Sequence, residues 1–178
     1  MYTEKVILAI NEVADLFISK AITFLTESDF KVVFSNKIKE KFDGNITVNT
    51  ESPWYDTYET CKTYHVDITA FDQNKLQITY DPKSKRKGYK YDEEALAIEI
   101  KYFRYENDIS EIEKDFKKIR LLIKAPKNEC FIIASARTIE IFLIAKEFMH
   151  SQLNLYRDEY KSRVKIYLIG PEEMIEIE

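Results

Sequence analysis

The sequence is poor in the residues that mark several classes of protein. Its 178 residues include two cysteines, three glycines and four prolines. Cys61 and Cys130 are too few for a disulfide framework, and no second cysteine stands at zinc-ligand spacing from either, so both are expected to be core thiols. The scarcity of glycine excludes a glycine-rich phosphate loop, and neither glycine nor proline gathers into a flexible linker.

Long apolar segments are also missing. No apolar run approaches the roughly 18 residues that would span a membrane. Charged residues interrupt the first 17 residues, whereas a secretion signal has an uninterrupted apolar centre. The expected location is therefore cytoplasmic, with no membrane partner. The formal net charge of −4 argues against a protein that coats nucleic acid with its whole surface, although it is compatible with a local basic groove.

What is present describes an ordinary globular chain. A hydrophobic fraction of 45% and a charged fraction of 33% are typical of a folded protein, and the length predicts one domain over residues 1–178. The pattern predicts a helix over 4–26, strands over 30–34, 45–50, 63–71, 75–80 and 95–103, a helix from near Asp108 or Ser110 to before Pro126, a strand over 130–135, a helix over 138–153 and a strand over 164–170. Strands followed by strand-helix-strand units predict an α/β fold, a central mixed sheet flanked by helices.

Three charged residues stand inside segments that are otherwise apolar. Glu99 and Lys101 interrupt "ALAIEIKYF" and share one face of the expected strand, while Asp67 interrupts "HVDITAF". If the two strands are neighbours, the carboxylates would repel each other unless a cation lay between them. Oxygen ligands without a nearby ligating histidine favour magnesium or manganese over zinc. A nearby lysine that orients water and stabilises developing charge would then suit phosphodiester hydrolysis.

An acid on one strand, then Glu-x-Lys in a second apolar strand, then a helix resembles the PD-(D/E)XK nuclease superfamily, which has the restriction endonuclease-like fold. The resemblance implies a core over about 60–135, with the helix at 4–26 and the C-terminal helix and strand added to it. It implies that Asp67 and Glu99 bind magnesium, that the main-chain carbonyl of Ile100 joins them, and that Lys101 assists the attacking water. It further implies DNA rather than RNA as substrate, and a homodimer as one of the expected states. Val66 stands where the name of the motif has proline.

Two other interpretations stay open. In the first, the same fold is a catalytically silent module that binds nucleic acid or a protein partner. In the second, Glu-x-Lys is fortuitous in a purely structural protein, and the three charged groups do not converge.

A basic cluster lies between the two strands of the motif. Residues 83–90 contain Lys83, Lys85, Arg86, Lys87 and Lys90. The cluster is predicted to contact nucleic-acid phosphates, and the alternative is a solvated hairpin tip with Gly88 in its turn.

Further charged residues have simpler interpretations. Glu12 and Glu51 are additional candidate acids, although the first fits a solvated helix face and the second fits a loop. On the helix after the motif, Lys117, Lys118 and Arg120 could meet a nucleic-acid backbone, and exposed helix charge is the simpler account.

Overall fold

The computed structural model describes residues 2–55, 63–81, 86–91, 94–124 and 127–178. The strands within these ranges are β1 (Ile46–Tyr55), β2 (Thr63–Asp72), β3 (Leu76–Asp81), β4 (Arg86–Tyr91), β5 (Ala95–Phe103), β6 (Asn128–Ala136), β7 (Val164–Ile169) and β8 (Met174–Glu176). In the described part of the chain they form one eight-stranded sheet in the order β3-β4-β1-β2-β5-β6-β7-β8. The predicted α/β class with a mixed sheet is confirmed.

Strand direction changes in the middle of this sheet. β2 pairs with both β1 and β5 in antiparallel fashion, whereas β5, β6 and β7 run parallel. The parallel strands are joined through helices, as such crossovers require. The long interval before β5 contains a hairpin in which β3 pairs with β4, and Gly88 pairs with Thr79 inside the ladder. The expectation that Gly88 lies in the hairpin turn is therefore wrong.

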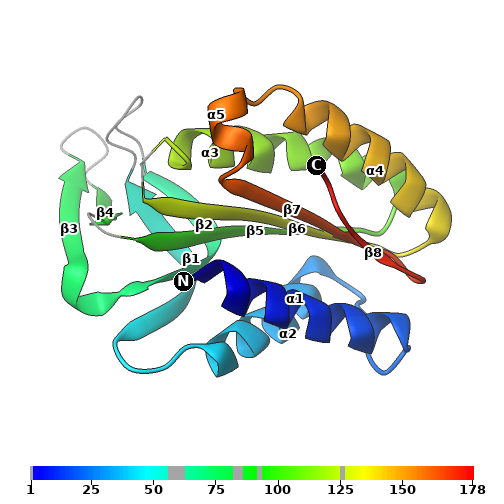
Figure 1. Cartoon of the computed structure of the whole chain (residues 1–178), viewed down its shortest axis with the longest axis horizontal. Helices are drawn as coiled ribbons and strands as arrows, with labels where there is room; N and C mark the ends of the chain where they lie inside the picture. The colour runs from blue at the N-terminus through cyan, green and yellow to red at the C-terminus, as the bar shows by residue number, and fades with distance from the viewer. Residues whose placement is uncertain (1, 56–62, 82–85, 92–93, 125–126) are drawn as a thin grey trace.

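Helices cover both faces of the sheet (Figure 1). On one face lie α1 (Tyr2–Ile18) and α2 (Glu27–Lys41), and on the other lie α3 (Glu113–Leu122), α4 (Ile139–Leu153) and the short α5 (Asp158–Lys161). Two 3₁₀ turns, η1 (Gln73–Lys75) and η2 (Glu106–Ile112), complete the described elements. β5 contributes to both cores, because its even-numbered residues pack with α1 and α2 while Ala95, Ala97 and Phe103 pack with α3 and α4.

The single helix predicted over 4–26 is wrong, because the chain turns at Lys20. The backbone of Lys20 is left-handed, with φ of 62°. Its N–H bonds to the Phe17 carbonyl and the Ala21 N–H bonds to the Leu16 carbonyl, which is the Schellman arrangement that closes a helix. The apolar periodicity does continue beyond this point, but local backbone geometry ends α1.

The strand predicted over 30–34 is also wrong, since these residues belong to α2. A capping box begins this helix, with Thr26 as its N-cap and Asp29 returning the hydrogen bond. Phe30, Phe34 and Ile38 then recur every four residues and are fully buried. Helical spacing of these large side chains outweighs the β propensity of "FKVVF".

The remaining predicted elements are confirmed, with shifts at their ends. The helix expected from near Asp108 starts as η2 and becomes α-helical at Glu113. Cys130 is buried as a free thiol, and Cys61 lies outside the described residues. In the ranges described, no helix has both the length and the apolar character needed to cross a membrane.

Candidate functional site

Asp67 and Glu99 meet where two neighbouring strands separate. The ladder between β2 and β5 ends at the pair Ile68 and Ile98, and one further step in the same register brings Asp67 opposite Glu99. There Asp67 Oδ2 accepts a hydrogen bond from the Ile100 N–H at 2.8 Å. The N–H and C=O of one strand residue point to the same edge, so the Ile100 carbonyl also faces the opening between the strands.

Glu99 is the most deeply buried acid of the group. It is 1% exposed, and its Oε2 accepts a hydrogen bond from Lys118 Nζ at 2.6 Å. Lys118, which projects from α3, also donates to the His65 carbonyl at 2.8 Å. Within the described residues, Oε1 of Glu99 has no hydrogen-bond partner. One oxygen of a buried carboxylate is thus left without the partner that such groups normally have.

Asp67 is neutralised from the opposite face of the sheet. Lys31 of α2 lies 2.7 Å from Asp67 Oδ1 and 2.5 Å from Glu51 Oε1. Glu51, which has a left-handed backbone at φ of 53°, is therefore linked to the site through this lysine. Each carboxylate thus has a lysine of its own as counter-charge, Lys31 for Asp67 and Lys118 for Glu99.

Lys101 points away from the two acids. Its ammonium pairs with Glu27 of α2 at 3.1 Å and with Glu111 of η2 at 3.2 Å. The sequence places Glu99 and Lys101 on one strand face, but Lys118 rather than Lys101 contacts Glu99. Lys101 instead lines a surface hollow of about 320 Å³ whose other residues include Glu27, Arg104 and Glu111.

Burial dominates the electrostatics of this cluster. It raises the pKa of Glu99 well above its usual range, with Lys118 opposing the shift and the Asp67 carboxylate adding to it. Burial alone would lower the pKa of Lys31 and of Lys101, yet the carboxylates that pair with each lysine raise both values overall. The carboxylates of the site lie beside lysines, but burying their charges still costs free energy. Strongly shifted pKa values of this kind are typical of functional sites.

Asp115 gives this cluster a measurable pH dependence. Burial raises its pKa from 3.8 to about 6 against the opposing charges of Lys118 and Lys101. At about 1.4 kcal/mol per unit, ionised Asp115 destabilises the folded protein by about 3 kcal/mol at neutral pH. Because the folded state binds the proton more tightly, the free energy of unfolding is expected to rise as pH falls from about 7 to 4. Asp115→Asn should flatten that slope in urea unfolding measured across pH.

A matched control for Asp115→Asn is available on the same helix. Glu113 is exposed, and its hydrogen bond with Lys117 lowers its pKa. Glu113→Gln should therefore keep the rise in stability on acidification. If Asp115→Asn and the unmodified protein show parallel profiles, Asp115 is not a buried ionised carboxylate.

The donor groups fit a magnesium ion held by few protein ligands. No group of three His, Cys, Asp or Glu side chains placed to hold a metal occurs within the described ranges. Magnesium, however, is usually bound through one or two carboxylates together with waters. Asp67, the unpartnered Oε1 of Glu99 and the Ile100 carbonyl supply hard oxygen atoms of that kind.

The other candidate residues fall in different places. Glu12 pairs with Lys37 and Lys41 on the α1–α2 surface, as expected for a solvated helix face. Of the basic cluster, Lys83 and Lys85 lie outside the described residues, and the side chains of Arg86, Lys87 and Lys90 are not described although their backbone forms β4. The prediction that this cluster contacts nucleic acid stays a prediction.

Sequence reasoning missed Lys31 and assigned Lys118 to an exposed face. The misassigned "FKVVF" strand concealed the helical position of Lys31, which follows Phe30. Lys118 occurs two residues after Phe116 and one before Ile119, both buried, so it borders the apolar side of α3. That position was the available signal for an inward-facing lysine.

Comparison with protein-family models, with curated proteins and with solved structures finds no match to this chain. The resemblance to PD-(D/E)XK nucleases therefore depends on the residues of the motif alone.

Proposed function

We propose that this protein is a magnesium-dependent nuclease with a restriction endonuclease-like fold, which hydrolyses phosphodiester bonds of DNA at Asp67, Glu99 and Lys101. The observation that carries the proposal is the position of Glu99. This carboxylate is 1% exposed and stands opposite Asp67, one register step beyond the last strand pair, and one of its oxygens has no partner among the described residues. Such an arrangement is costly for stability alone, and ligation of a divalent cation would use the unpartnered oxygen.

The residues have separable roles in this reaction. Bound to Asp67, Glu99 and the Ile100 carbonyl, Mg²⁺ would lower the pKa of a bound water and shield the phosphate. In hydrolysis the attacking water would form the new P–O bond and give a proton to solvent, while the P–O bond to the leaving oxygen breaks and that oxygen takes a proton from solvent. The Lys101 ammonium pairs with Glu27 and Glu111 and lines a hollow whose lining includes neither Asp67 nor Glu99. In the proposed reaction it would leave these partners and turn toward the phosphate, where it would stabilise the charge that develops on the phosphate oxygens. Lys31 and Lys118 hold the charges of Asp67 and Glu99 in this structure, and a metal bound by the two carboxylates would have to take over that role.

Plasmid and single-stranded DNA cleavage tests the proposal. We expect cutting with Mg²⁺ or Mn²⁺ and none with EDTA. Asp67→Asn should lose both cleavage and Mn²⁺ binding measured by calorimetry, because it removes a charged ligand. Lys101→Met should keep Mn²⁺ binding and lower the cleavage rate by about 10²-fold, the usual cost of removing one charge-stabilising group.

Glu129→Gln is the control for these variants. Glu129 lies on the neighbouring strand β6 and accepts a hydrogen bond from Thr3. It should cut like the unmodified protein. Metal-dependent cutting that survives both Asp67→Asn and Lys101→Met would contradict the proposed site.

A second candidate function has one observation in its favour. Both carboxylates already contact ammonium groups, so the chain itself supplies the charge that a metal would supply. This arrangement suits a catalytically silent module of the same fold that binds nucleic acid or a protein partner. This second function would be favoured by a folded protein that binds DNA, gives no heat of Mn²⁺ binding in calorimetry and does not cut DNA.

A further inference from the structure

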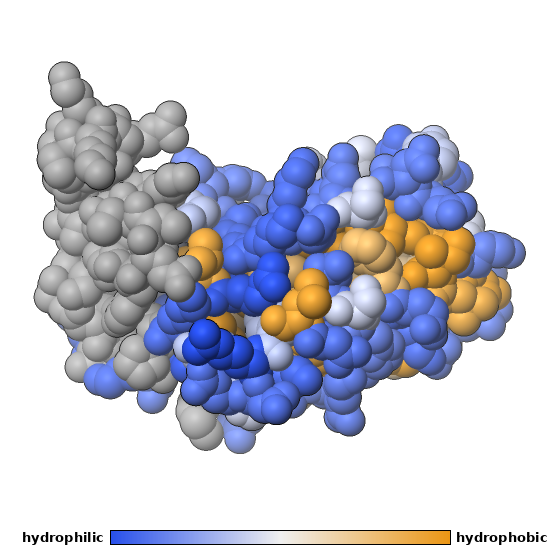
Figure 2. All heavy atoms as spheres, turned by 90° about the horizontal axis from the view of Figure 1, so that it is seen from above, coloured by the Kyte–Doolittle hydropathy of each residue, from blue (hydrophilic) through white to orange (hydrophobic). Residues whose placement is uncertain are grey.

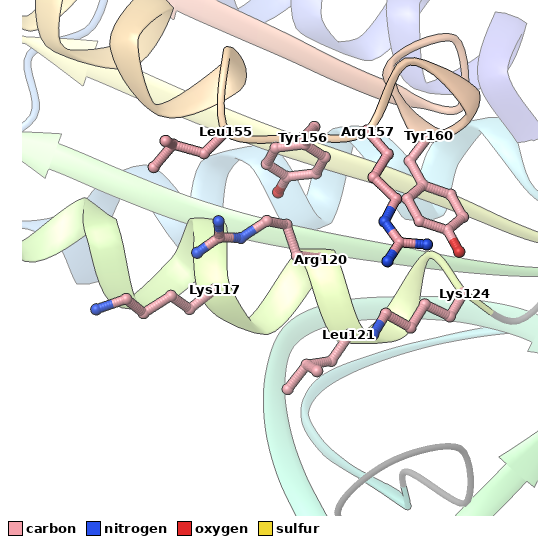
Figure 3. A pocket seen from close by; sticks show the side chains of 8 residues that line it. All are labelled: Lys117, Arg120, Leu121, Lys124, Leu155, Tyr156, Arg157 and Tyr160. Carbon is pink, nitrogen blue, oxygen red and sulfur yellow. The ribbon is translucent and has the colours of Figure 1, made fainter.

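A basic and aromatic groove lies on the surface of the helical layer opposite α1 and α2. It occupies about 350 Å³ between α3 and the segment that joins α4 to α5 (Figure 3). Four cations and two aromatic rings line it, namely Lys117, Arg120, Lys124, Arg157, Tyr156 and Tyr160. None of the described residues that line it is acidic. This concentration of positive charge contrasts with the net charge of −4 of the whole chain.

One wall of the groove is a stripe along α3. Lys117 and Arg120 lie three residues apart on one side of α3, and Lys124 follows in the turn just after the helix ends. Lys118, the next residue after Lys117, points to the other side and contacts Glu99. The groove and Lys118, which contacts Glu99, therefore lie on different sides of the same helix.

The opposite wall presents its side chains toward α3. Figure 3 shows Arg157 and Tyr160 projecting from their segment toward the helix. Tyr156 is fixed at the base, because it is buried and its hydroxyl donates to the Phe116 carbonyl at 2.9 Å. The Arg120 guanidinium lies 5.8 Å from the centre of the Tyr156 ring. The groove thus combines long cationic side chains at its rim with a fixed aromatic floor.

Three of these cations are available to an external anion. Within the described part of the chain, no carboxylate forms an ion pair with Arg120. Lys117 pairs with Glu113 and Arg157 with Glu159, but three of these side chains are mostly exposed and Glu113 is about half exposed. Exposed pairs of this kind contribute little to stability, so a polyanion can replace them at small cost.

Figure 2 looks onto this helical layer and shows a mostly hydrophilic surface, with apolar side chains gathered toward the end where α4 lies. Exposed Ile139, Leu143 and Ile144 belong to α4. Leu121 and exposed Leu155 also line the groove, but its four cations and its lack of acidic lining residues among those described favour an anionic ligand.

We propose that this groove binds a single-stranded segment of nucleic acid, with phosphates on the cations and a base against Tyr160. Single-strand binding sites combine cations that follow the backbone with rings on which bases stack. A duplex keeps its bases stacked inside and would leave Tyr160 unused, and an acidic peptide would leave both rings unused. The choice of nucleic acid as ligand rests on the proposed function, because a nuclease must also hold the strand that it cuts.

Fluorescence anisotropy with a labelled oligothymidylate in EDTA measures this binding without cleavage. Arg120→Gln/Arg157→Gln should weaken binding by about tenfold. The slope of log affinity against log salt should fall by about 1.4, because each phosphate that a cation neutralises adds about 0.7 to it. The matched control is Lys39→Gln/Lys146→Gln, which removes the same charge from α2 and α4 and should bind as the unmodified protein does. Tyr160→Leu should weaken binding by about tenfold without changing the salt slope, as removal of a stacking ring predicts.

Each alternative ligand has its own outcome. Equal affinity of the groove variant and the unmodified protein would overturn the proposal. The proposal would also be overturned if free thymidine monophosphate competed as well as the oligomer at equal phosphate concentration. The same holds for polyglutamate whose carboxylate concentration equals the phosphate concentration of the oligomer. Cleavage measured on the same proteins separates the two proposals. Groove-dependent binding without metal-dependent cutting keeps the groove and removes the nuclease, whereas cutting that is independent of the groove variants does the reverse.

Discussion

Glu99→Gln is expected to lower metal-dependent DNA cleavage by at least about 10²-fold while leaving the protein folded. The amide keeps the shape of the side chain but removes the negative charge that would hold Mg²⁺, and charge-stabilising groups of active sites commonly contribute about 10²–10³-fold. Initial rates on plasmid DNA with saturating Mg²⁺ measure the effect. Mn²⁺ calorimetry on the same protein should show weakened binding.

Stability must be measured together with that rate. The variant no longer buries a charge, but Lys118 loses a charged partner, and these two effects oppose each other. We therefore expect the free energy of unfolding to change by less than about 1.5 kcal/mol. Full activity in Glu99→Gln would remove Glu99 from the reaction, whereas loss of activity through unfolding would appear directly in the urea transition. Glu129→Gln serves again as the control for a neighbouring strand.

The sequence predicts six of the eight strands described, without β4 and β8, and it predicts the first helical layer poorly. β5 coincides with "ALAIEIKYF", in which every residue but Lys101 is buried. A short, almost continuously apolar run of this kind is typical of a strand in the interior of a sheet. The helix expected over 4–26 divides because a residue without special propensity, Lys20, adopts a left-handed backbone. Local closure of this kind depends on hydrogen bonds formed by the carbonyls of Leu16 and Phe17, which no side-chain pattern records.

The candidate site was likewise predicted in part. Alternation places Asp67 and Glu99 on their strands, and the structure adds that β2 and β5 are neighbours. The sequence indicates that Lys118 borders the apolar side of its helix, but not which acid it contacts, because Lys31 and Lys118 come from helices on opposite faces of the sheet. Contact between them and the strands depends on how the helices pack and on the separation of β2 from β5 beyond Ile68. Sequence spacing alone favoured Lys101 as the neighbour of Glu99, which the pairing of Lys101 with Glu27 and Glu111 contradicts.

Lys118→Met is expected to destabilise the protein by about 3–5 kcal/mol at pH 8, the usual cost of removing one partner of a buried ion pair. The Glu99 carboxylate would remain buried without its cation, and its pKa, already raised by burial, would rise further. The folded variant would then bind a proton at Glu99 that the unfolded chain releases. The loss in free energy of unfolding should therefore decrease as pH falls from 8 toward 4.5, the usual pKa of a glutamate side chain. Urea unfolding across this range measures it.

Two further variants assign this destabilisation to the buried charge rather than to the shortened side chain. Glu99→Gln/Lys118→Met removes both charges and should recover most of the stability, as replacing a buried pair by neutral groups generally does. Lys117→Met removes the adjacent lysine, which is exposed and paired with Glu113, and should change stability by less than about 0.5 kcal/mol. If Lys118→Met costs no more than Lys117→Met, Glu99 is protonated in the folded protein and needs no cation. Cleavage would then require the metal to displace a proton from Glu99, and the cutting rate would rise with pH through the raised pKa of Glu99.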